Sequence, residues 1–122
     1  MNILGETLPD LDVADLETAK KIDAFYEKYQ GAGSAVADES RRVVIIETIC
    51  NAVFEGFDDL FGDGTAKLVF GDKTNMRDCI KAAGQVTAEI QIAQNALTDE
   101  IKETKKNMGN RAARRSAAKN KK

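Results

Sequence analysis

The stretch FDDLFGDGTAKLVFGDKTN, residues 57–75, most constrains how this 122-residue chain can fold. It contains three glycines, and each of them interrupts any regular helical or strand period. Three phenylalanines lie between or beside these glycines, which favours a compact bend that turns its aromatic rings inward. The residues that define this structural bend are Phe57, Phe61, Gly62, Gly64, Phe70, Gly71 and Asn75.

Apolar residues recur every three or four positions on both sides of the bend, which predicts amphipathic helices. We expect helices over residues 13–30, 38–61 and 76–106, with Asp12 and Asn75 as N-caps of the first and third. A short helix over residues 66–70 would lie within the bend and end at Gly71. The apolar residues around Gly5-Glu6 predict a small N-terminal hairpin. The fold class is therefore mainly all-α, a three-helix domain with a helical bend.

The second helix has the strongest apolar periodicity, from Val43 to Phe61. Val44 and Ile45 widen its apolar face, so we expect this helix to pack between the first and the third. Gly56 lies inside it, where a glycine costs about 1 kcal/mol relative to alanine. Close approach of another backbone would explain a glycine at this position.

The third helix would be ~45 Å long at 1.5 Å per residue, which exceeds the thickness of a domain of this size. Its second half is therefore expected to project, with an apolar seam that continues the heptad spacing. The residues of this seam that we predict to bind a partner are Ile90, Leu97 and Ile101. That partner would be a second copy of the chain, giving a homo-oligomer, or a helical client.

Charge divides the chain into two parts. Residues 1–104 hold ten Lys or Arg and twenty Asp or Glu, whereas residues 105–122 hold eight Lys or Arg and no acid. Because Gly109 interrupts the apolar pattern, residues 1–106 are predicted to be the helical domain and 107–122 a basic disordered tail. Arg111, Arg114 and Arg115 would contact an acidic partner, and binding to nucleic acid or simple solubilisation are the alternatives.

No pattern of catalytic residues is found in the sequence. The chain has no His, and its acidic residues do not follow the calcium-loop spacing. Gly62-Asp63-Gly64-Thr65 lacks the Lys of a phosphate-binding loop. We therefore expect no enzyme, cofactor or metal site, and no membrane segment. Cys50 and Cys79 are expected to be buried reduced thiols, with a disulfide between the helices as the alternative.

Residues 49–83 resemble the centre of small proteins encoded among the tail genes of tailed phages and prophages of Gram-positive bacteria. The resemblance is carried by residues 57–65, FDDLFGDGT, by residues 70–73, FGDK, and by Asn75 ahead of Cys79. Residues 110–115, NRAARR, also resemble the ends of these proteins. Many of them have a bulky residue near the position of Ala82 and Ala83, where this chain has two small ones.

Many proteins of this kind are described as tail assembly chaperones, and the resemblance implies a binding role. Such a chaperone coats the tape-measure protein, recruits tail-tube subunits in the cytoplasm of the host bacterium, and is absent from the finished particle. A structural neck or tail-completion component of the virion is the competing interpretation. A nucleic-acid-binding protein with a basic tail is the third, and the lack of aromatic residues in that tail weighs against it.

Overall fold

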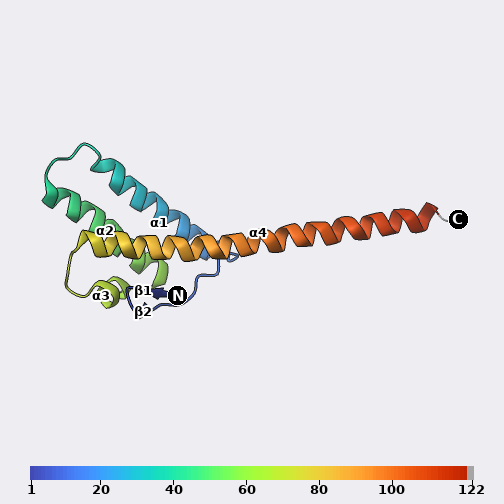
Figure 1. Cartoon of the computed structure of the whole chain (residues 1–122), viewed down its shortest axis with the longest axis horizontal. Helices are drawn as coiled ribbons and strands as arrows, with labels where there is room; N and C mark the ends of the chain where they lie inside the picture. Colours follow the sequence, from blue (N-terminus) through green and yellow to red (C-terminus); the bar gives the residue numbers. More distant parts are fainter. Residues whose placement is uncertain (121–122) are drawn as a thin grey trace.

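A computed structural model describes the backbone of residues 1–120 and the side chains of residues 1–107. The elements in chain order are β1 Asn2–Ile3, β2 Glu6–Thr7, α1 Leu16–Ala35, α2 Arg42–Phe61, α3 Thr65–Phe70 and α4 Met76–Asn120. The protein is mainly α-helical, as predicted. α1 and α2 form an antiparallel pair, α4 crosses this pair, and the C-terminal part of α4 extends away from the folded body (Figure 1).

α2 is the central helix, because it contacts α1, α3 and α4. The predicted starts of α1 and α2 are each wrong by three or four residues. α1 begins after Asp15, whose carboxylate accepts a hydrogen bond from the Thr18 N–H at 3.0 Å, so Asp15 rather than Asp12 is its N-cap. α1 also continues through the glycine-rich segment 31–34, because buried Ala32 anchors its last turns.

α1 and α2 pack closely where Phe25 meets Gly56. A Cβ atom at Gly56 would overlap Phe25 Cδ2 and lie 2.7 Å from Phe25 Cε2. The glycine therefore makes room for an aromatic ring, not for a backbone as the sequence suggested. Because Phe25 is only 2% exposed, its ring cannot swing aside into solvent.

A cluster of aromatic rings connects α1, α2 and α3. Phe57 is fully buried, with its ring centroid 6.2 Å from that of Phe25 on α1 and 5.3 Å from that of Phe70 on α3. Phe54 and Phe61 complete the cluster from α2. The predicted inward turn of the bend is thus confirmed, and these rings give α3 its place against α2.

The bend depends on backbone conformations that favour glycine. Gly62, Gly64 and Gly71 all have positive φ, at 112°, 90° and 65°. Gly71 ends α3, and its N–H donates to the Lys67 carbonyl at 2.8 Å. The sequence did not foresee the role of Asp58, which projects from α2 and accepts a hydrogen bond from the Ala66 N–H at 2.9 Å. This contact satisfies an otherwise free donor in the first turn of α3.

The predicted N-terminal hairpin is present, with its turn at Leu4-Gly5 instead of Gly5-Glu6. Ile3 and Leu8 are buried in the core. The Leu4 N–H donates to Gln85 Oε1 on α4 at 2.9 Å, so this hydrogen bond holds the hairpin against the first part of α4. Packing of this kind stabilises a two-stranded hairpin that would be marginal alone.

α4 begins where expected, with Asn75 Oδ1 accepting hydrogen bonds from the N–H groups of Arg77 and Asp78. Its end differs from the prediction. The helix does not stop near Lys106 but continues past Gly109 to Asn120. One interior glycine costs only about 1 kcal/mol, and the surrounding Ala, Arg and Lys residues are good helix formers. That residues 107–122 are dispensable for folding stays a prediction.

We expect Gly56→Ala to destabilise the protein by about 1–3 kcal/mol, because the added methyl group would displace the Phe25 ring from its packed position. Helix propensity alone predicts that this substitution would stabilise the protein, because alanine is a better helix former than glycine. Gly84→Ala in α4 is the matched control, since nothing lies within 4 Å of a Cβ atom there. That control should stabilise by roughly 0.5–1 kcal/mol. Urea unfolding measures the free energy of unfolding of both variants. A stabilising Gly56→Ala would show that the Phe25 ring does not pack against this glycine.

Gly71→Val should destabilise by roughly 1–3 kcal/mol, because a β-branched residue is strained at this positive φ. No atom lies within 4 Å of a Cβ atom at this position, so the cost would come from backbone strain and not from a clash. The control is Asp72→Val at the exposed neighbouring position, and thermal unfolding gives the melting temperatures of the two variants. Equal melting temperatures for the two variants would contradict the role assigned to Gly71.

Candidate functional site

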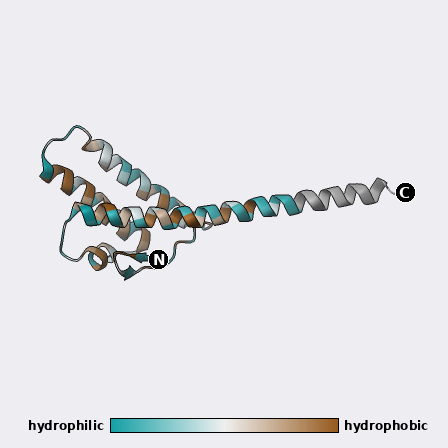
Figure 2. Cartoon of the chain, in the orientation of Figure 1, coloured by the Kyte–Doolittle hydropathy of each residue, from teal (hydrophilic) through white to brown (hydrophobic). Residues whose placement is uncertain are grey.

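α4 has two parts with different surroundings. Its first part lies against α2 and the N-terminal hairpin and contributes a row of core side chains at helical spacing. These are Cys79, Ala82, Ala83, Val86 and Ile90, each at most 2% exposed. From residue 91 to residue 107 no side chain is buried. The apolar stretches of Figure 2 accordingly give way to a mostly hydrophilic helix along α4.

Ile90 does not belong to the exposed surface to which the sequence assigned it. It is only 1% exposed, as the last core residue of α4. The sequence underestimated how far the body extends along α4, because the packing of the N-terminal segment against this helix could not be seen. Leu11 and Met1 line a hollow together with Ile90 and Ala93, which shows that this segment lies beside the helix.

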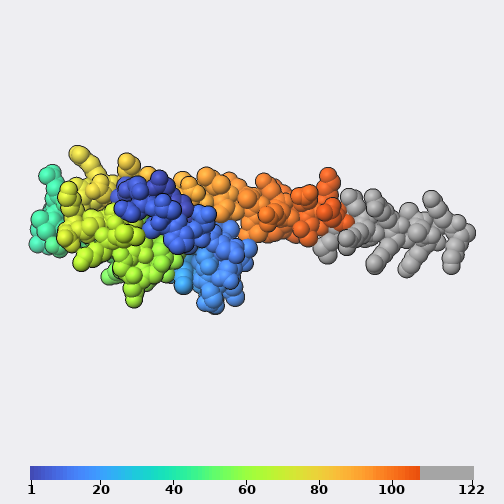
Figure 3. All heavy atoms as spheres, turned by 90° about the horizontal axis from the view of Figure 1, so that it is seen from below, coloured from blue at the N-terminus to red at the C-terminus, as the bar shows by residue number. Residues whose placement is uncertain are grey.

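The remaining predicted seam residues do lie on the projecting part of α4. Ile101 is 48% exposed and Leu97 is partly exposed. Together with Glu100, Thr104 and Lys105 they line a shallow hollow of about 390 Å³. Leu97 and Glu100 also border a hollow beside residues 11–14, and beyond them α4 stands clear of the body in the space-filling view (Figure 3). We call Leu97, Ile101 and Thr104 the α4 seam.

Arg111, Arg114 and Arg115 lie outside the residues whose side chains are described, and their backbone belongs to α4. The positive charge predicted for this region therefore follows the seam along the same helix. The two groups of predicted partner-binding residues are thus brought onto one continuous element, apart from Ile90.

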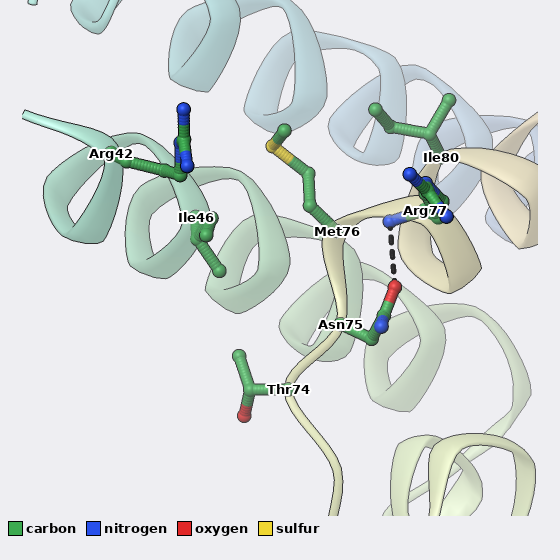
Figure 4. Close-up of a pocket in the computed structure, with 7 residues that line it drawn as sticks. All are labelled: Arg42, Ile46, Thr74, Asn75, Met76, Arg77 and Ile80. Carbon is green, nitrogen blue, oxygen red and sulfur yellow. Dashed lines mark hydrogen bonds between the residues drawn. The ribbon is translucent and has the colours of Figure 1, made fainter. Parts of the chain in front are cut away.

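A second surface, missed at the sequence level, lies where α2 and α4 begin. Arg42 and Ile46 of α2 face Met76, Arg77 and Ile80 of α4 across a groove of about 540 Å³ (Figure 4). Ile80 is 46% exposed and Val43, on the first turn of α2, is 67% exposed. Both belong to apolar stripes at helical spacing, which predict core positions for them. The apolar run of residues 43–46 was the available signal, and within residues 1–107 no element covers the Val43 side chain.

The buried cysteines have no reactive character. Cys50 and Cys79 are free thiols with no exposed surface, as expected for the reduced form. Burial raises the pKa of the Cys79 thiol, and the neighbouring Cys50 acts in the same direction. The protonated thiol is a poor nucleophile, so this pair serves packing between α2 and α4.

Charged groups on the body also have structural roles. Lys28 of α1 pairs with Asp59 at 2.9 Å and with Glu55 at 3.4 Å on α2. The hydrogen bond to Asp59 raises the pKa of Lys28. Within the described residues no group of three potential metal ligands is found. The same residues include no helix that is long and apolar enough to cross a membrane.

Comparison with known proteins gives one match. The model of a family described as "Family of unknown function (DUF6673)" matches residues 4–118. The chain belongs to this family. The match begins after β1 and includes β2, the bend and nearly all of α4, so the DUF6673 unit contains most of the packed body and the projecting helix. No curated protein and no solved structure matches the chain.

Proposed function

We propose that this DUF6673 protein is a binding protein of the tail-assembly-chaperone type. It would hold the tape-measure protein, recruit tail-tube subunits, or do both, during phage tail assembly in the cytoplasm of the host bacterium. Two observations support this function: the resemblance of residues 49–83 and 110–115 to such chaperones, and the exposed α4 seam. In this role the protein would act by binding other proteins and would catalyse no reaction.

The observation that carries the proposal is the projecting part of α4. A monomer gains little by ordering a helix on which no side chain from residue 91 to residue 107 is buried, because most helical stability in proteins comes from tertiary packing. The α4 seam offers apolar side chains at the spacing used when one helix packs on another. A long helical client such as a tape-measure protein has the complementary form.

The charge of the residues beside the α4 seam changes from acidic to basic along the helix. The seam begins beside the acidic body and leads into a segment that holds eight Lys or Arg and no acid. A client with an acidic segment next to its apolar stripe would be bound in one orientation, since complementary charges fix register as well as speeding encounter. Added salt would weaken this part of the binding.

The test is co-purification of the protein with the tape-measure and tail-tube proteins encoded beside it. Leu97→Lys combined with Ile101→Lys should abolish capture and leave thermal unfolding unchanged, because neither side chain is buried. Gln91→Lys combined with Asn95→Lys is the matched control. It adds the same charge to exposed positions away from the seam and should retain capture.

Capture by the seam variant with unchanged affinity would move the contact to another surface. Failure of the unmodified protein to capture either tail protein would refute the proposed function itself. Mass spectrometry of purified particles separates the structural alternative, because a neck or tail-completion component would be found there and a chaperone would not.

A further inference from the structure

The folded body carries two exposed apolar surfaces of opposite charge. The basic surface is the groove formed by Arg42, Ile46, Met76, Arg77 and Ile80, together with Val43 on the adjoining turn. The acidic surface lies between the N-terminal segment and α4, and its lining includes Leu11, Asp12, Val13, Glu89, Ala93, Ala96, Leu97 and Glu100, the last two of which also border the hollow at the α4 seam. We propose that copies of this chain associate head to tail, with the basic surface of one copy on the acidic surface of the next.

The basic surface has apolar contact area and uncompensated charge. Val43 is 67% exposed and Ile80 is 46% exposed, although both lie on well-ordered helices of the body. Among residues 1–107 neither Arg42 nor Arg77 has an ion-pair partner within 4.0 Å. The first turn of α2 contains no acidic residue. An occupant with apolar side chains flanked by carboxylates would match this surface.

The acidic surface supplies that chemistry. Two hollows of about 270 and 240 Å³ lie side by side where residues 10–14 meet α4, since both are lined by Leu11, Ala93 and Ala96. Glu89 borders one hollow, and Asp12 and Glu100 border the other. These three carboxylates are also without an ion-pair partner among the described side chains. The carboxylates at the edges of these apolar hollows complement in charge the guanidinium groups of Arg42 and Arg77.

The positions of the two surfaces decide the mode of association. Ile80 and Ala96 are sixteen residues apart on α4, which corresponds to ~24 Å along the axis. The surfaces therefore cannot meet within one copy. A two-fold contact of the basic surface with itself would bring arginines against arginines, and like charges would also oppose pairing of two acidic surfaces. The remaining contact joins unlike surfaces. Made head to tail, this contact is heterologous and extends into a chain or ring of copies, whereas a reciprocal two-fold pairing would close as a dimer.

Sedimentation velocity of the purified protein at low salt tests the proposal without any client, so its outcome is independent of the proposed function. The average mass should rise with concentration beyond that of a dimer. Arg42→Glu with Arg77→Glu should leave a monomer, and so should Glu89→Lys with Glu100→Lys. All four positions are exposed, so thermal unfolding should be unchanged.

The decisive measurement is an equimolar mixture of the two double variants. The intact surfaces of the two variants should pair, and their two charge-reversed surfaces are complementary as well, so the mixture should associate again with the variants alternating. The quadruple variant, with both charges reversed, should associate again. A monomeric unmodified protein, a mixture that does not associate, or association that survives both charge reversals would overturn the proposal. Loss of association in an Ile101→Lys variant alone would instead assign self-association to the α4 seam, because Ile101 borders the seam hollow and not the acidic surface.

Discussion

The contact of the Phe25 ring with Gly56 sets the distance between α1 and α2, and the rest of the body is built on that pair. Because the ring fills the space that a side chain at position 56 would need, the two helices come close enough for Phe25 to reach Phe57. Phe57 in turn packs on Phe70, which positions α3 and the bend. α4 then closes the opposite side of α2 through Cys79 and its neighbouring core residues.

Much of this fold follows from the sequence. The alternation of glycines and phenylalanines in residues 57–75 was sufficient to predict the bend, because positive φ and aromatic burial are local requirements. The periodicity from Val43 to Phe61 likewise identified the central helix. The reason for Gly56 was not predictable, since the residue that occupies its place, Phe25, lies thirty-one positions earlier in the chain.

The surfaces were harder to predict than the core. Apolar periodicity does not say where a core ends, so Val43 and Ile80 were assigned to the interior and Ile90 to the exposed seam. The structure reverses all three assignments. In each case the outcome depends on which distant segment covers the helix. The N-terminal hairpin and the segment after it cover Ile90, and no element of the described chain covers Val43.

The resulting molecule is a packed body from which one helix extends. The buried core side chains of α4 end at Ile90. The α4 seam and the basic end of the helix lie beyond that residue. Exposed apolar side chains on a helix without tertiary support are a feature of binding surfaces rather than of folding units. This division of α4 between folding and binding is the central claim on which the proposed function rests.

Amide hydrogen exchange along α4, measured at a concentration where the protein is monomeric, tests this claim most directly. Residues 79–90 should exchange as slowly as α2, because they open only when the body unfolds. Residues 95–107 should exchange faster by orders of magnitude, and a bound tail protein should slow them selectively. Equal protection of both parts in the free monomer would contradict the account, because it would mean that the projecting helix is already packed within its own domain.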